Sequence, residues 1–172
     1  MKNNKGMTVV EVLVAISIVS IIILVTYSVY IGNAKHIWKA EIESKLQNEA
    51  QIIESTFSQL SMQTKGIELE SEYIHDGEEY YDVKYLVLQS ENSIFNWSIN
   101  GKELKLNVKD KKENIFKENL ISENIESFKV RPIDEIKLED SKIVEVDISL
   151  RKQSGFNDIL YPISMIVTFR NK

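Results

Sequence analysis

The sequence predicts an α+β protein, in which a long N-terminal stem helix, membrane-spanning in its first half, packs on an antiparallel β-sheet head. Three observations predict this class. An uncharged apolar run extends from residue 12 to residue 34, and apolar residues then recur at helical spacing to about residue 61. After Gly66 the period changes to alternation of apolar and polar residues, with hairpin signals between the runs. One amphipathic helix and a one-faced sheet bury their apolar sides against each other.

The first half of the helix has the length of a membrane span. A helix from Val12 to Gly32 is about 31 Å long at about 1.5 Å per residue, which matches the hydrocarbon thickness of a bilayer. Lys2 and Lys5 precede it, and lysines on this side favour a cytoplasmic N-terminus. We therefore expect a single-pass topology with the distal part outside the cytoplasm.

The second half of the helix is apolar on one face. No proline occurs between Met1 and Arg131, so we expect one helix from about Thr8 to about Ser61, broken at Lys65-Gly66. Because no heptad is sustained, the stripe predicts packing on the protein's own core rather than a coiled coil. Its members are Trp38, Ile42, Leu46, Ile53, Phe57 and Leu60.

The distal part predicts an antiparallel meander of about six or seven strands, each with one buried face. The expected strands are residues 67–70, 81–88, 94–99, 103–108, 125–130, 143–150 and 160–169. Turns are expected at 75–78, at Asn100-Gly101 and at 153–158, because Asp-Gly and Asn-Gly are hairpin signals. We expect a solvated connection at 109–113 and a loop with a short helix at 114–124.

The charge is divided unevenly along the chain. Residues 1–40 carry four lysines and one glutamate, a net charge of +3. Because the whole chain has a net charge of −5, residues 41–172 carry a net charge of −8. An acidic distal part argues against nucleic-acid binding, which needs a basic face. The chain has no cysteine, which excludes disulfides and cysteine-ligated metals.

The sequence contains none of the catalytic motifs that would indicate an enzyme. No phosphate-binding loop, serine-nucleophile elbow or zinc-binding histidine pair is present, so we expect no catalytic residues, no cofactor and no metal. Asp134-Glu135 and Glu139-Asp140 form an acidic stretch that lacks the pattern of a calcium loop. A solvated acidic loop is the preferred interpretation, and calcium binding stays open.

Glu11 lies at the start of the apolar run, and its presence helps to distinguish between the possible functions of that run. An ordinary secretory signal, cleaved after Gly32-Asn33-Ala34, does not need this carboxylate, and neither does a plain membrane anchor. Because a carboxylate beside a membrane segment costs up to a few kcal/mol, it usually marks a function.

The residues Gly6-Met7-Thr8-Val9-Val10-Glu11, followed by the apolar helix, resemble the class III signal of type IV prepilins and type II secretion pseudopilins. The resemblance implies that a membrane-embedded prepilin peptidase, an aspartyl protease, cuts between Gly6 and Met7 on the cytoplasmic side and N-methylates Met7. Glu11 and Thr8 then stand where the family places its glutamate and threonine. Met7 replaces the usual phenylalanine, and Val10 replaces a common leucine or isoleucine.

The resemblance also implies how the chain is divided. Residues 1–6 are a leader, 7–33 a transmembrane and filament-core helix, 34–62 an amphipathic helix continuing into the head, and 63–172 the globular head of a pilin-like fold. In a filament, Glu11 of one subunit meets the Met7 amine of its neighbour, and Thr8, Val9 and Val10 belong to the same assembly contact. In apolar surroundings such a pair acts as a register device.

These expectations define a structural subunit of a type IV pilus-like filament. Its expected partners are the prepilin peptidase, other pilin subunits, the assembly platform and, before assembly, the membrane. We expect it first in the cell membrane and then at the cell surface. The strands around 128–130, 144–150 and 167–169 resemble W/J-type minor pilins, which favours a minor subunit. The alternatives are a pseudopilin of a secretion or competence system, and a membrane-tethered or secreted binding module with an ordinary signal.

Overall fold

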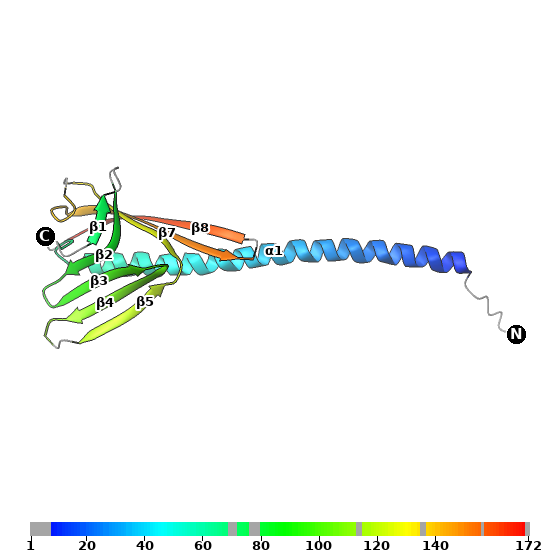
Figure 1. The fold of residues 1–172 in the computed structure, drawn as a ribbon, viewed down its shortest axis with the longest axis horizontal. Helices are drawn as coiled ribbons and strands as arrows, with labels where there is room; N and C mark the ends of the chain where they lie inside the picture. Colours follow the sequence, from blue (N-terminus) through cyan, green and yellow to red (C-terminus); the bar gives the residue numbers. More distant parts are fainter. Residues whose placement is uncertain are drawn as a thin grey trace. The chain divides into compact units, whose positions relative to one another are not determined.

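The computed structural model describes residues 8–68, 72–75, 80–112, 115–134, 137–155 and 157–170. In this part of the chain it contains one α-helix and eight β-strands (Figure 1). The strands are β1 (Glu72–His75), β2 (Tyr81–Gln89), β3 (Ser93–Asn100), β4 (Glu103–Asp110), β5 (Phe116–Ser122), β6 (Ile125–Pro132), β7 (Ile143–Ser154) and β8 (Asn157–Thr168). By its internal contacts the chain divides into two compact units, Met1–Glu41 and Ile42–Lys172.

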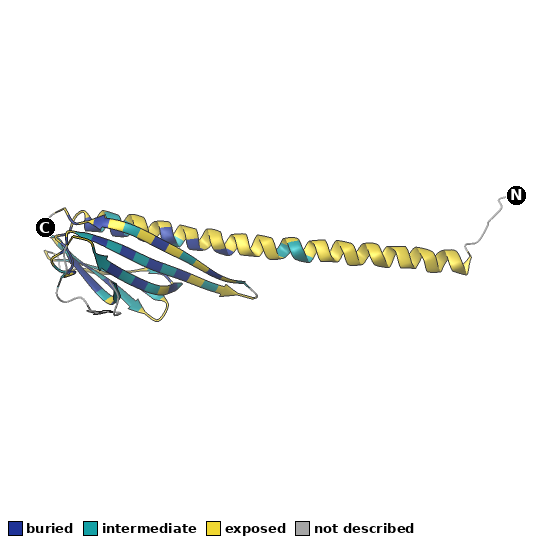
Figure 2. Ribbon diagram, turned by 90° about the horizontal axis from the view of Figure 1, so that it is seen from above, coloured by how far each residue is buried: buried dark blue, intermediate teal, exposed yellow. Residues whose placement is uncertain are grey.

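Helix α1 (Val9–Ser61) confirms the expected stem helix. Every residue from Thr8 to Tyr30 is exposed, as the unbroken yellow of this part of α1 shows in Figure 2. The helix is long and apolar enough to cross a membrane. Three hydroxyl groups within the apolar run donate to the carbonyl oxygen four residues earlier, each at 2.8 Å, so they are satisfied inside the helix; they belong to Ser17, Ser20 and Thr26.

The distal half of α1 buries the predicted stripe. Leu46, Ile53 and Phe57 have no exposed surface, and Ile42 and Ala50 are nearly as buried. Trp38 stands in register with this stripe but is 61% exposed. The core contribution of α1 therefore begins at Ile42, one helical step later than the sequence pattern suggested.

The helix ends in a compact turn rather than fraying. The Thr64 hydroxyl donates to the carbonyl oxygen of Ser61 at 3.2 Å, and both side chains are buried. Gly66 then adopts a φ of 148°, a conformation that L side chains rarely adopt. The backbone N–H of Lys65 donates to Gln89 of β2 at 3.1 Å, which sets the chain alongside the sheet.

The sheet is antiparallel throughout and forks at β2. Tyr85 is paired with β1 on one edge of β2 and with β3 on the other, while Tyr81 is paired with β1 on one edge and with β6 on the other. Strands β3 and β6 therefore share one edge of β2. The fork produces two groups of strands, a first wing β1-β2-β3-β4-β5 and a second wing β6-β7-β8.

One aromatic side chain of the helix joins the two wings. The ring of Phe57 lies 5.3 Å from that of Trp97 in β3 and 6.1 Å from that of Phe128 in β6, the latter edge-on. The wings are also linked by two residue pairs between β2 and β6, and by a hydrogen bond of 3.0 Å from the Ile125 N–H of β6 to the carbonyl of Lys102 in the turn after β3. Because edge-on and tilted aromatic contacts add to the burial of the rings, Phe57 forms a stabilising apolar contact with each wing.

A polar contact also ties α1 to the turn between the wings. The Glu49 carboxylate accepts hydrogen bonds from the Ser122 hydroxyl at 2.6 Å and from the Asn124 amide at 2.8 Å. Ser122 is the last residue of β5, and Asn124 lies between β5 and β6, where the chain passes from one wing to the other. Glu49 therefore holds that crossing against the helix through hydrogen bonds to a charged acceptor.

Two sequence expectations for the head were wrong. Residues 116–122, expected in a loop with a short helix, form strand β5 on the edge of β4. The segment is exposed over most of its length, so it shows no alternating burial pattern and is held by strand pairing with β4. In the expected strand at 67–70, Ile67 forms only an isolated bridge with Leu88, residues 69 and 70 lie outside the described residues, and the regular strand begins at Glu72.

The other strands agree with the alternating patterns, and the dark and light steps along them in Figure 2 follow those patterns. The hairpin after β3 turns at Gly101-Lys102, because Asn100 is still paired with Glu103 and Gly101 takes the positive φ of 62°. The expected turn at 75–78 falls mostly outside the described residues.

Candidate functional site

The residues singled out by the N-terminal motif lie on both sides of the described boundary. Lys2, Lys5, Gly6 and Met7 are outside the described residues. Thr8, Val9, Val10 and Glu11 form the start of α1, with Val9 the first helical residue. The described part of the candidate site is therefore its helical half, from Thr8 to Glu11.

Thr8 and Glu11 form a reciprocal helix cap. The Thr8 backbone N–H donates to Glu11 Oε2 at 2.8 Å, and the Thr8 hydroxyl donates to the same oxygen at 3.0 Å. The Glu11 backbone N–H lies 3.3 Å from Thr8 Oγ1. Two groups that the first turn of a helix leaves without partners are thus satisfied by each other's side chains.

The cap gives Glu11 a local role that sequence reasoning missed. Threonine followed three residues later by glutamate, directly before an apolar run, is the sequence pattern of a capping box. The segment Thr8-Val9-Val10-Glu11 fits this pattern as well as the class III signal. A carboxylate in the first turn also faces the positive end of the helix dipole, which stabilises it further.

The surroundings of the cap are apolar and exposed. Val9 is 77% and Val10 is 68% exposed, and no residue of the described chain covers them. The charged group and its apolar neighbours are therefore presented together on the surface of this helix. Such a surface suits burial in a lipid or protein environment in which the carboxylate keeps a hydrogen-bonded partner.

The acidic loop considered for calcium uses its first carboxylate for its own backbone. Asp134 accepts the hydroxyl of Ser141 and the backbone N–H groups of Lys142, at 3.0 Å, and Ile143, at 3.1 Å. These hydrogen bonds, chiefly the one from Ser141, lower the pKa of Asp134 to about 2. Among the described residues no group of three or more potential ligands stands ready for a metal, and Glu135 lies outside them.

The hydrogen bonds of Asp134 predict that the stability of the folded head depends on pH. The pKa of Asp134 is about 2 in the folded chain against an ordinary 3.8, so its stabilisation is present above about pH 4 and is lost as the pH falls towards about 2. We expect Asp134→Asn to lower the urea midpoint of unfolding at neutral pH, and to lose less stability than wild type as the pH falls from about 4 to about 2.

Urea unfolding at a series of pH values measures both effects. Asp140→Asn, an exposed carboxylate of the same loop, is the control, and an identical pH profile for the two variants would contradict the assignment.

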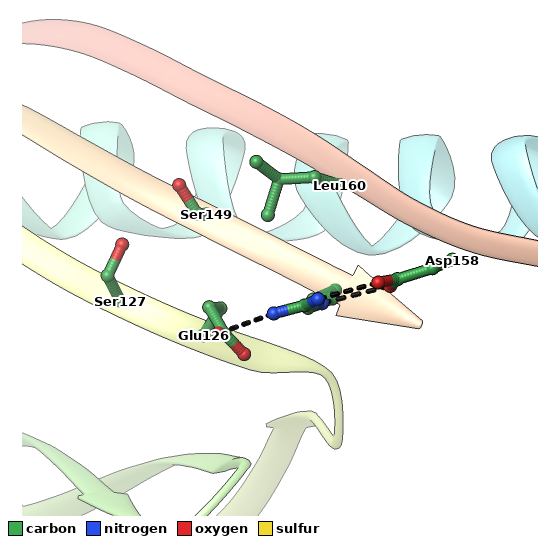
Figure 3. Close-up of a pocket in the computed structure, with 6 residues that line it drawn as sticks. Glu126, Ser127, Ser149, Asp158 and Leu160 are labelled. Carbon is green, nitrogen blue, oxygen red and sulfur yellow. Dashed lines mark hydrogen bonds and ion pairs between the residues drawn. The ribbon is translucent and has the colours of Figure 1, made fainter. Parts of the chain in front are cut away.

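Two polar clusters on the outer face of the second wing are neutralised internally. Arg151 binds Asp158 through two hydrogen bonds, at 2.6 and 2.9 Å, and Glu126 at 3.1 Å, beside a depression lined also by Leu160 (Figure 3). With two carboxylates on one guanidinium, the depression offers no free cation to an anionic ligand.

The second cluster surrounds Tyr80, whose ring lies under the Arg131 guanidinium at 5.0 Å. A hydrogen bond with Asp147 and desolvation raise the pKa of Tyr80 to about 12. The phenol therefore stays protonated and donates to the carboxylates beside it, among them Glu145 at 3.3 Å. The arrangement thus joins Tyr80 to β6 and β7 through a hydrogen bond and a cation–π contact.

Comparison with known families identifies a known motif in the N-terminal stretch. Residues 1–27 match the family model of the prokaryotic N-terminal methylation motif, a match that includes the helix cap and most of the exposed apolar run. A comparison with curated proteins found no match. The motif supports a pilin-like or pseudopilin-like structural subunit anchored through its N-terminal helix rather than an enzyme. The chain thus carries at its N-terminus the class III signal of type IV pilins.

Proposed function

We propose that this protein is a structural subunit, of the minor pilin type, in a type IV pilus-like filament. One observation carries the proposal: the matched methylation motif runs directly into a helix whose apolar side chains are exposed on every face from Val9 to Tyr30. A soluble protein does not expose apolar surface of this extent. The helix suits a bilayer first and the interior of a helical filament afterwards.

Cleavage on the cytoplasmic side of this helix leaves it attached to the product. The proposed cut between Gly6 and Met7 removes residues 1–6, including Lys2 and Lys5, whose charges set the topology. The new amine at Met7 is methylated and lies one residue before the Thr8–Glu11 cap. Glu11 then serves two purposes, as the helix cap within one subunit and as the acceptor for the Met7 amine of the next.

The proposed partners follow from this sequence of cleavage, methylation and assembly. Prepilin peptidase binds the segment around Gly6, where the absence of a side chain lets the backbone approach a protease cleft closely. The assembly platform and neighbouring subunits contact the segment that includes Thr8, Val9, Val10 and Glu11. The head remains outside the cytoplasm throughout. The likeness of the late strands to W/J-type minor pilins supports the minor assignment.

Processing gives the first test. We expect the native protein to have the intact mass of residues 7–172 plus one methyl group. Gly6→Val is expected to keep residues 1–6 attached, because a branched side chain hinders the extended approach to the protease. Intact-mass spectrometry of membrane and filament fractions measures both results.

Gly32→Ala is the matched control, because a Cβ at Gly32 meets nothing within 4 Å and the site lies far from the cut. This variant should be processed like wild type. A native chain that starts at Lys35, or one that is never cut, would contradict the proposal and favour the tethered or secreted binding module. Processed protein in cells that form no visible fibres would instead favour the pseudopilin of a secretion or competence system.

A further inference from the structure

The outer edge of strand β5 is open. Strand β5 stands last in the sheet (Figure 1), and no strand of the described chain pairs with its second edge. The N–H of Asp110 donates to the carbonyl of Ile115 at 3.1 Å, so residues 115, 117 and 119 bond inward to β4. The backbone groups of Phe116, Glu118 and Leu120 therefore face outward, where they can pair with another strand.

Strand β8 stands at the other end of the sheet, and its edge is protected. The N–H of Phe169 donates to the carbonyl of Lys142, so the odd-numbered residues of β8 bond inward and the even-numbered residues face outward. Pro162 occupies an outward position near the middle of the strand, and it has no N–H to donate. Strand β5 has no such proline.

The edge of β5 also carries exposed apolar side chains. Phe116 is 58% and Leu120 is 49% exposed, and both point to the same face of the sheet because they are four residues apart. Glu118 lies between them on this face, while Lys117 and Asn119 lie on the other. An open edge with a large apolar side chain towards each end is a surface that proteins usually cover.

A second copy of β5 fits this edge in one register. If two copies pair antiparallel about a two-fold axis, residues of equal parity stand opposite each other, because successive side chains point to opposite faces. A pair centred on Lys117 sets two lysines against each other, and a pair centred on Asn119 sets Leu120 against Glu118. A pair centred on Glu118 instead places Phe116 of each copy opposite Leu120 of the other. Lys117 then lies opposite Asn119 and meets no like charge.

Glu118 is the residue that meets its own counterpart in this register. Its Oε1 lies 3.1 Å from Nζ of Lys105 in β4 of the same copy. Lys105 also pairs with Glu103, at 3.2 Å, so it neutralises Glu118 only in part. Because these side chains are partly exposed to water, the repulsion between the two Glu118 carboxylates is weak but not absent.

We infer that the β5 edge is a docking site for the β5 edge of a second copy, paired antiparallel and centred on Glu118. Each outward residue exchanges both of its backbone hydrogen bonds with its partner, and the pairs of Phe116 with Leu120 add apolar contact on one face. The two copies contribute the same surface, so the contact is closed and joins two heads only.

The symmetry of the contact decides which copies can make it. A two-fold axis perpendicular to a sheet reverses every direction in the plane of the sheet, including that of the α1 segment from Ile42 to Ser61, which packs on it. The chain therefore enters the two heads from opposite ends. Copies in one membrane enter their heads from the same end, so the contact suits copies on two facing surfaces. The inference thus goes beyond the proposed function and does not require a filament.

Cysteine variants of the full-length chain test the register, because the natural chain has no cysteine. Two preparations of lipid vesicles carry differently tagged copies with their heads outside, and mixed-tag disulfide dimers are measured after mixing and mild oxidation. Glu118→Cys in both preparations should give the dimer, because the Cα atoms of such a pair are about 5.5 Å apart. Lys117→Cys against Asn119→Cys should also give it. Either of these two variants against itself should not, because the Cα atoms are then about 7–8 Å apart.

Substitutions beside the cysteine supply the controls. Phe116→Asp, added to Glu118→Cys, should lower the dimer yield about tenfold, because a carboxylate then faces Leu120. Ile166→Asp is the matched control, because Ile166 is 69% exposed on the edge strand β8 and receives the same charge; the yield should not change. Glu118→Gln, added to both partners of the Lys117→Cys and Asn119→Cys pair, should raise the yield severalfold because it removes the repulsion.

The outcomes separate this inference from the proposed function. The absence of any mixed-tag dimer overturns the inference, and so does a dimer that joins only copies of the same vesicle. Equal yields from Glu118→Cys and from Lys117→Cys or Asn119→Cys against itself would indicate another register or random collision, and they overturn it as well. The intact mass of the native protein reports independently whether residues 1–6 have been removed.

Discussion

Replacing Phe57 with alanine is expected to lower the free energy of unfolding of the head by about 3–5 kcal/mol. Phe57 has no exposed surface, and its ring contacts Trp97 of the first wing and Phe128 of the second. Alanine leaves a cavity at the fork, where the two wings share only a short pairing through β2 and β6. Both the burial of the ring and its contact with one aromatic ring of each wing are lost.

Tryptophan fluorescence during urea unfolding measures this effect. The chain has two tryptophans, Trp38 and Trp97, so a Trp38→Phe background makes the buried Trp97 the single reporter. Ile52→Ala is the matched control, because Ile52 lies on the same helix and is 50% exposed; we expect a loss well below that of Phe57→Ala. A Phe57→Ala head as stable as the Ile52→Ala head would show that the ring does not join the wings.

Glu11→Gln and Glu11→Ala are expected to be processed and methylated normally, yet both are expected to be excluded from filaments. Glutamine retains a side-chain oxygen that accepts the Thr8 N–H, so it preserves the helix cap while removing the negative charge. Alanine removes both. Intact mass measures processing, and the share of each variant in sheared fibres measures incorporation.

The comparison of the two variants separates the two roles of Glu11. If Glu11→Gln enters filaments as well as wild type while Glu11→Ala does not, the side chain acts as a cap and the proposed pair with the Met7 amine is wrong. Thr8→Ala provides the converse variant, because it loses the hydroxyl of the cap but leaves the carboxylate. Glu54→Gln, elsewhere on α1, controls for the loss of one negative charge.

Local sequence patterns predicted the helix and most of the strands. The spacing of Ile42, Leu46, Ile53 and Phe57 specified the buried face of α1, and Lys65-Gly66 specified its end. The Asn-Gly signal located the hairpin between β3 and β4 to within one residue. These features depend on residues a few positions apart, and the periodicity of apolar residues can be recognised within such a short window.

Non-local features were not predictable in the same way. The fork at β2 depends on the pairing of Tyr81 with Val130. The hydrogen bond between Glu49 and Ser122 joins residues more than seventy positions apart. Strand β5 was missed because its exposed residues show no buried face, so its strand form depends on the edge of β4 beside it. The capping box depends on residues only three positions apart, and its pattern overlaps the class III signal, because Thr8 and Glu11 belong to both.

The uninterrupted course of α1 has a mechanical consequence. The helix continues without a break from the apolar segment into the core, where Leu46, Ile53 and Phe57 are completely enclosed. Tension applied to this helix at Ile42, where its buried face begins, therefore reaches the sheet through packed side chains. A fibre built of such subunits would resist pulling until the enclosed half of each helix is drawn out of its head.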